Sequence, residues 1–197
     1  MARARHKWGL LGGSAVLVAS SLVGCHEGEP VREQYPLWTQ QGTAVEFPQD
    51  FRGRVVLVAF FYVQCPDICP MIAERMRQIW EALPDTAGVQ AVMISFDPRR
   101  DTPERLRDFA QAHGLPEPGF VLASGRPEVV DQLVERFGVV VQKTPSEFTA
   151  GGEAYFFAHS DVLFLLDSQG RIRKRYSGTD APIAEVVRDV EQLRQER

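Results

Sequence analysis

The sequence predicts an α/β sandwich, in which a central mixed β-sheet is flanked by helices, and three observations support this class. Val55–Val63 is an unbroken apolar run of β-branched and aromatic residues, which is typical of a strand buried on both faces. Stretches with apolar residues at helical spacing then alternate with further short apolar runs, as expected of helices layered on a sheet. Near the end, Val162–Asp167 and Arg171–Tyr176 are separated only by a tight turn, which indicates a hairpin before the last helix.

The other elements follow from local signals, taken in chain order. Four helices are predicted, each opening at a proline, a residue that suits the first helical turn; they cover residues 70–83, 103–113, 127–137 and 182–195. Short strands are predicted between them at Val89–Ser95, Phe120–Leu122 and Val139–Gln142. Residues 143–158 show no clear periodicity, so we expect a long loop or a small hairpin excursion there, and long loops in compact domains are often functional.

Length and composition fit one globular domain. The chain has 197 residues, enough to bury a core without a disulfide framework. Hydrophobic residues make up 44% and charged residues 24%, which argues against a mostly disordered chain. The net charge is −4 and no long basic run occurs, so we expect no nucleic-acid partner.

The N-terminal 24 residues have the pattern of a signal segment. Arg3, Arg5 and Lys7 form a basic start, and 17 uncharged residues follow. The run ends in Leu22-Val23-Gly24-Cys25, which resembles the lipobox of bacterial lipoproteins. We therefore expect cleavage before Cys25 and attachment of lipid to that cysteine, with an uncleaved signal anchor as the alternative.

This N-terminus implies three regions and a location. Residues 1–24 are the predicted lipoprotein signal peptide, residues 25–36 are lipidated Cys25 and a polar tether, and residues 37–197 are the folded domain. Both alternatives place the domain at the cell membrane, outside the cytoplasm and facing the periplasm or extracytoplasmic space.

Cys65 and Cys69 form the remaining pair, in the sequence CPDICP, where the buried strand passes into a helix. A turn-like or helical path brings residues i and i+4 to the same side, so the two sulfur atoms can converge. The helix N-terminus favours thiolate over thiol, although the negative charge of Asp67 works modestly the other way. A thiolate can bind a soft metal or attack a disulfide, and the spacing leaves both open beside an inert disulfide or two buried thiols.

Three histidines follow the signal segment. His26 lies beside the anchor, and His113 ends a predicted helix, where a basic side chain interacts favourably with the dipole. His159 precedes the apolar strand and can approach the cysteines only if the preceding loop folds back over them. A single histidine at such a place is more often a structural group than a ligand. Two thiolates and one imidazole would nevertheless suit copper, whereas structural zinc prefers four ligands.

Three stretches of the chain together resemble the Sco/SenC proteins. They are Phe60–Pro70 (FFYVQCPDICP), Ser95–Pro103 (SFDPRRDTP), and His159-Ser160 ahead of Leu165–Asp167. The resemblance covers about residues 37–195, in order and at family-like spacing. Val63-Gln64 departs from the Thr-His that family members commonly carry, and residues 153–158 match the family only loosely.

The resemblance implies a thioredoxin-like (peroxiredoxin-type) fold and a metallochaperone role without catalytic turnover. Carried over residue by residue, ligands of Cu(I) and Cu(II) fall on Cys65, Cys69 and His159. The implied partner is subunit II of cytochrome c oxidase, whose binuclear copper centre is assembled. A copper donor or a thioredoxin-like reductant is the further implied partner.

Asp97 and Asp101 match acidic positions of the family's second stretch. We interpret both as local, Asp97 in a turn before Pro98 and Asp101 as negative charge ahead of the helix that opens at Pro103. A supporting role beside the metal is the alternative.

Two enzymatic functions are the alternatives to copper delivery. In a thiol–disulfide oxidoreductase, Cys65 and Cys69 would be the redox-active pair that reduces the cysteines of the oxidase's copper site. A thiol peroxidase on the same fold ranks last, because Tyr62 stands where such sites usually carry Thr or Ser.

Overall fold

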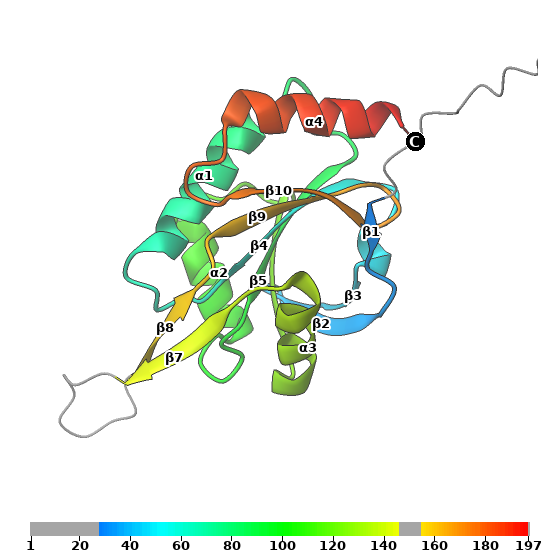
Figure 1. Ribbon diagram of the computed structural model, residues 1–197. Coiled ribbons are helices and arrows are strands. Elements are labelled where there is room, and N and C mark those ends of the chain that lie inside the picture. The colour runs from blue at the N-terminus through cyan, green and yellow to red at the C-terminus, as the bar shows by residue number, and fades with distance from the viewer. Residues whose placement is uncertain (1–27, 146–154, 197) are drawn as a thin grey trace, which may run out of the picture.

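The computed structural model describes residues 28–145 and 155–196, so the predicted signal peptide and Cys25 lie outside the described residues. Within the described ranges, no helix has the length and apolar character needed to cross a membrane. Eight strands form one sheet in the order β1-β10-β9-β4-β5-β6-β2-β3, with helices on both faces (Figure 1). A separate two-stranded sheet consists of β7 and β8.

The strands of the large sheet are β1 (Glu29–Pro30), β2 (Tyr35–Thr39), β3 (Ala44–Phe47), β4 (Val55–Phe61), β5 (Val89–Ser95), β6 (Phe120–Gly125), β9 (Val162–Leu166) and β10 (Arg171–Ser177). The small sheet pairs β7 (Val141–Pro145) with β8 (Tyr155–His159). The helices are α1 (Ile68–Ala82), α2 (Pro103–Ala112), α3 (Pro127–Phe137) and α4 (Ile183–Gln195), with a 3₁₀ turn at Gln49–Phe51.

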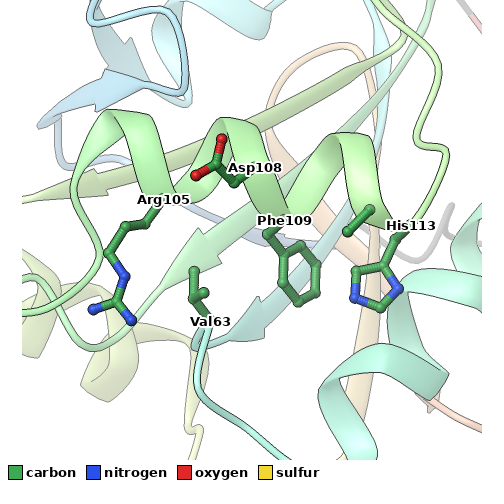
Figure 2. A pocket seen from close by; sticks show the side chains of 6 residues that line it. Val63, Arg105, Asp108, Phe109 and His113 are labelled. Carbon is green, nitrogen blue, oxygen red and sulfur yellow. The ribbon is translucent and has the colours of Figure 1, made fainter.

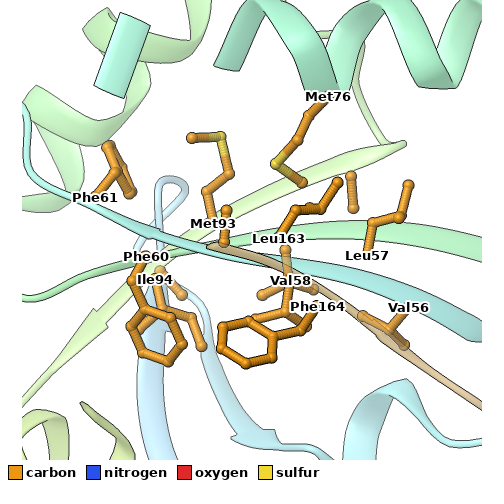
Figure 3. Close-up of a cluster of buried hydrophobic side chains, with 14 of the residues drawn as sticks. Val56, Leu57, Val58, Phe60, Phe61, Met76, Met93, Ile94, Leu163 and Phe164 are labelled. Atoms are coloured by element: carbon orange, nitrogen blue, oxygen red, sulfur yellow. The ribbon is translucent and has the colours of Figure 1, made fainter. Parts of the chain in front are cut away.

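Strand β4 lies at the centre of the large sheet. It pairs in parallel with β5 and antiparallel with β9, and all seven of its side chains are buried. Successive side chains of a strand point to opposite faces, so Phe60 and Val58 lie on one face while Phe61 and Leu57 lie on the other (Figure 3). Both faces of β4 therefore belong to the core, as the sequence predicts, although the strand ends at Phe61, two residues before the predicted end at Val63.

Helices cover the two faces unequally. Figure 1 shows α1 and α4 together on one face and α3 on the opposite face. On the first face, the ring of Phe61 packs on Phe109 of α2, with 4.9 Å between centroids, and Met76 of α1 lies over the same side (Figure 3). On the second face, Phe60 packs on Phe137 of α3 at 5.2 Å. The predicted α/β sandwich is confirmed.

Most helix ends agree with the local signals. Thr102 is the N-cap of α2, and its side-chain oxygen accepts a hydrogen bond from the N–H of Arg105 at 3.4 Å. Helix α3 has the predicted bounds and ends at Gly138, whose φ of +65° favours glycine. Helix α1 begins at Ile68, two residues before the predicted start at Pro70.

Two N-terminal features differ from the sequence-based expectation. The β2–β3 hairpin has no counterpart among the predicted elements, because its strands are short and Pro36 weakens the strand signal. Residues 29–36 were expected to belong to the tether, but β1 pairs with β10, and Val31 and Tyr35 are buried. Isolated apolar residues in a polar stretch give no local sign of a pairing with a strand about 140 residues later.

The segment that lacked a clear periodicity contains a hairpin, one of its two expected forms. Strands β7 and β8 pair antiparallel, with Val141 opposite His159 and Lys143 opposite Phe157. Figure 1 shows this hairpin extending away from the large sheet near the start of α1. Residues 146–154, between the two strands, lie outside the described residues.

Two phenylalanines that both lie on strands should differ greatly in how much their replacement by alanine destabilises the fold. Phe164 is 1% exposed and packs on the rings of Phe60 and Phe137, whereas Phe156 of β8 is 42% exposed. We expect Phe164→Ala to lower the free energy of unfolding by about 3–5 kcal/mol in urea denaturation. Phe156→Ala is the matched control and should change it little; equal losses for the two variants would contradict this assignment of the core.

Candidate metal site

Three side chains from three segments meet at one end of the sheet. The sulfur atoms of Cys65 and Cys69 and a ring nitrogen of His159 all lie within 4.8 Å of one another. Cys65 lies between β4 and α1, Cys69 is the second residue of α1, and His159 ends β8. The structure therefore brings together the three residues that the sequence predicted as metal ligands.

The exit from β4 positions the two cysteines. After Phe61 the chain turns, and the Cys65 N–H donates to the carbonyl oxygen of Tyr62 at 3.2 Å. The N–H of Cys69, in the first turn of α1, donates to the Cys65 sulfur at 3.4 Å. Both cysteines are free and buried, Cys65 with 8% exposure and Cys69 with none. The predicted convergence of the sulfur atoms across the strand-to-helix junction is thus observed.

The pKa values of the two thiols are shifted in opposite directions. The neighbouring Cys69 thiol is the main cause that lowers the pKa of Cys65, to about 4, with further hydrogen bonds from the backbone N–H groups of Asp67 and Cys69, while burial opposes this. Burial is the main cause that raises the pKa of Cys69, and the adjacent Cys65 raises it further. Cys65 is therefore the thiolate of the pair at neutral pH, and Cys69 keeps its proton.

His159 presents a lone pair to the cysteines. Its Nδ1 lies 3.0 Å from the carbonyl oxygen of Ser160, which can only accept, so Nδ1 carries the hydrogen in the neutral ring. Nε2 is then unprotonated and lies 3.2 Å from the Cys69 sulfur. The rings of Phe96 and Tyr62 pack on the imidazole, with centroids 4.9 and 6.0 Å away. These contacts fix both the tautomer and the plane of the ring.

This donor set suits a soft or borderline metal. Two sulfur ligands favour Cu(I), and an imidazole nitrogen makes binding of Cu(II) feasible as well. A structural zinc site commonly uses four protein ligands, and the group found among the described residues supplies three. The residues present therefore fit copper better than structural zinc.

The other predicted candidates lie elsewhere. His113 is the C-cap of α2, and its ring packs on Phe109 with 4.2 Å between centroids. Both residues line a pocket of about 370 Å³ between α2 and Val63, which Figure 2 shows with Arg105 and Asp108 on the same helix. Burial lowers the pKa of His113. Cys25 and His26 lie outside the described residues.

Asp97 and Asp101 make contacts beyond their own loop, which the local interpretation did not include. The Asp101 carboxylate accepts the N–H of Val63 at 2.9 Å, and Asp97 accepts the hydroxyl of Tyr155 at 2.9 Å. Tyr155 itself was not singled out from the sequence. A signal existed, because both aspartates follow β5, and the carboxyl ends of the parallel strands β4 and β5 meet at the same edge.

The different acidities of the two thiols can be measured by alkylation. We expect iodoacetamide to modify Cys65 with a pH profile whose midpoint lies near the pKa of about 4, while Cys69 stays unmodified in the folded protein. Cys69→Ala removes the main hydrogen-bond donor to the Cys65 thiolate, so the midpoint should rise toward the ordinary thiol value of about 8.5. Cys65→Ser is the control that abolishes the reaction. A wild-type midpoint at the ordinary thiol value would contradict the assignment.

Comparison with known proteins places this geometry in a family. The SCO1/SenC family model matches residues 24–195. A SCO2-like protein of Rickettsia prowazekii is 29% identical over 126 residues, which are 64% of this chain and 59% of the relative. The matched part thus spans about three fifths of that relative's length.

Solved structures agree. A SCO1/SenC family lipoprotein from Bacillus anthracis, 24% identical, superposes with a TM-score of 0.72 over 85% of this chain and 96% of its own, which confirms the predicted thioredoxin-like fold. The structure of Bradyrhizobium japonicum ScoI with copper bound is 27% identical, with a TM-score of 0.66 over 82% of this chain and 98% of its own. The chain therefore belongs to the SCO1/SenC family.

Proposed function

We propose that this protein is a membrane-anchored, extracytoplasmic copper metallochaperone for assembly of the binuclear copper centre of cytochrome c oxidase subunit II. The observation that carries the proposal is the convergence of Cys65, Cys69 and His159 within 4.8 Å. The related ScoI structure from Bradyrhizobium japonicum has copper bound. The resemblance to Sco/SenC proteins supplies the oxidase as the recipient.

The site can hold copper in either oxidation state and release it again. The sulfur atoms of Cys65 and Cys69 suffice for Cu(I), which tolerates low coordination, and His159 adds the nitrogen that Cu(II) favours. A set of three protein ligands leaves room for a ligand of the recipient to enter. Copper is then cargo that a donor protein supplies and subunit II removes.

Exposed apolar side chains lie on α1, which carries Cys69, and in or directly before the β7–β8 hairpin, which carries His159. Among the described residues, the exposed large hydrophobic side chains are Met71, Val140 and Phe156. Met71 lies in the first turn of α1, Phe156 lies on β8, and Val140 directly precedes β7. Apolar surface at such positions favours contact with a partner protein, so we expect the recipient to dock on this end of the molecule.

The anchoring part of the proposal depends on the sequence of residues 1–25. Lipid on Cys25 would tether the domain to the membrane, with residues up to β1 as the connection. Figure 1 shows β1 at the opposite end of the sheet from β8 and the start of α1. A chain anchored in this way would present the cysteines and His159 away from its own attachment point.

The acidities of the two cysteines favour a second candidate, a thiol–disulfide oxidoreductase that reduces the cysteines of the same copper centre. The Cys65 thiolate would attack one sulfur of the partner's disulfide, forming a mixed disulfide and releasing the first partner thiolate. Cys69, after losing its proton, would attack the Cys65 sulfur, release the second partner thiolate and leave a Cys65–Cys69 disulfide. His159 is not required for these steps.

Copper binding by the reduced protein tests the leading proposal. We expect one copper per chain and, for Cu(II), a thiolate-to-copper charge-transfer absorption that Cys65→Ser abolishes. His159→Ala should weaken Cu(II) binding by at least about tenfold, which is the usual cost of losing a supporting group around a metal. The same variant should weaken Cu(I) binding less. His113→Ala is the matched control, because His113 is the C-cap of α2 and lies outside the site.

Two outcomes would change the assignment. Equal loss of Cu(I) and Cu(II) in His159→Ala would contradict the proposed division between the sulfur ligands and the imidazole. A reduced protein that holds no copper, but reduces the disulfide of subunit II equally well with and without His159, would move the function to the oxidoreductase.

Fatty-acid labelling in cells tests the anchor. We expect the native chain to incorporate labelled lipid and to lack residues 1–24, and Cys25→Ser to remain unlabelled. Cys69→Ser is the control that should keep the label. An uncleaved signal anchor predicts no label in any of the three and a chain that retains residues 1–24.

A further inference from the structure

The loop that follows β5 contacts both parts of the candidate metal site. It runs from Ser95, the last residue of β5, to Thr102, the N-cap of α2. Within it, Asp97 and Asp101 are only 2% and 0% exposed, although carboxylates are rarely buried without partners. Their partners come from the segment before Cys65 and from the β7–β8 hairpin.

Asp101 holds the segment that leads to Cys65. Its Oδ2 accepts hydrogen bonds from the N–H of Val63 at 2.9 Å and from the hydroxyl of Ser95 at 2.6 Å. The Ser95 hydroxyl oxygen in turn accepts the N–H of Asp97 at 3.0 Å. Ser95 therefore joins the carboxylate on the cysteine side to the residue that contacts the hairpin.

Asp97 and Arg100 hold the start of β8. The Asp97 carboxylate accepts hydrogen bonds from the hydroxyl of Tyr155, at 2.9 Å, and from Nε of Arg100. Nη1 of Arg100 donates to the carbonyl oxygen of Tyr155 at 3.0 Å, and its guanidinium carbon lies 3.7 Å from the centre of the Tyr155 ring. Tyr155 is thus held through its hydroxyl, its ring and its backbone.

The hairpin depends on such side-chain contacts. Within the described residues, β7 and β8 pair with each other and not with a strand of the large sheet. Further down β8, the Phe157 N–H donates to the Tyr62 hydroxyl oxygen at 3.2 Å, and the Phe157 ring packs on Tyr62 and Phe96. Tyr155 and Phe157 therefore fix β8 to the body ahead of His159, whose own ring packs on Phe96 and Tyr62 two residues later.

We propose that Asp97, Arg100 and Asp101 form a clamp that sets the position of His159 relative to the two cysteines. They are positioning residues: Asp101 fixes the approach to Cys65, and the Asp97–Arg100 pair fixes the hairpin through Tyr155. The clamp acts in the protein without metal, and its effect on copper rests on the proposed function.

The clamp should matter more for Cu(II) than for Cu(I). Loosening the hairpin displaces the imidazole, which Cu(II) favours, and leaves the paired sulfur atoms in place for Cu(I). We expect Arg100→Gln to weaken Cu(II) binding about tenfold. The charge-transfer spectrum of its Cu(II) complex should shift toward that of His159→Ala, and Cu(I) binding should not change. In the His159→Ala background, Arg100→Gln should have no further effect on Cu(II).

A readout without metal separates the clamp from the copper proposal. In the apo protein, Arg100→Gln should speed amide hydrogen exchange in residues 155–160 about tenfold, because the lost charged hydrogen bonds lower the cost of local opening. Exchange in β4 should not change. Tyr155→Phe, which removes only the hydroxyl contact with Asp97, should move both readouts in the same direction by less.

Arg99→Gln is the matched control, with the same charge change at an exposed neighbour in the same loop. The clamp is overturned if Arg100→Gln and Arg99→Gln behave alike in exchange and in Cu(II) binding, or if Arg100→Gln still weakens Cu(II) without His159. A third outcome separates the two proposals. If Arg100→Gln speeds hydrogen exchange but the wild-type protein binds no copper, the clamp is upheld and the proposed function is rejected.

Discussion

Burial of β4 on both faces is the constraint on which the rest of this structure depends. Its backbone pairs with β5 on one side and β9 on the other, and its seven side chains are all covered. Because neither face meets water, helices must lie on both, which fixes α1 and α3 on opposite sides of the sheet. The strand ends at Phe61, and the turn that follows places Cys65 and Cys69 at that edge of the sheet.

Copper binding and thiol oxidation compete for the same two sulfur atoms. Copper needs both cysteines reduced, and a disulfide between them would remove both sulfur ligands together. The low pKa of Cys65 serves either chemistry, because the thiolate is both the metal ligand and the nucleophile. The two candidate functions therefore differ in what His159 does. It is a ligand in the chaperone and dispensable in the oxidoreductase.

The proposed clamp explains why the loop after β5 contains the buried carboxylates Asp97 and Asp101. Asp97 and Asp101 are buried with partners from two distant segments, so neither acts only as a turn residue or as charge at a helix start. Arg100 completes the arrangement, since an unpaired carboxylate at the position of Asp97 would be costly to bury. The hairpin that carries His159 does not pair with the large sheet, and this loop supports it together with Tyr62.

Local pattern determined much of this protein from sequence alone. The apolar run of β4, the four helices and the terminal hairpin were predictable because burial and capping leave marks within a few neighbouring residues. The cysteine pair was predictable as a site for the same reason. The tertiary structure decided the approach of His159 to the cysteines, the hydrogen bond from Tyr155 to Asp97, and the pairing of β1 with β10. Their partners lie tens of residues or more apart, and no local periodicity records which distant segment a side chain will meet.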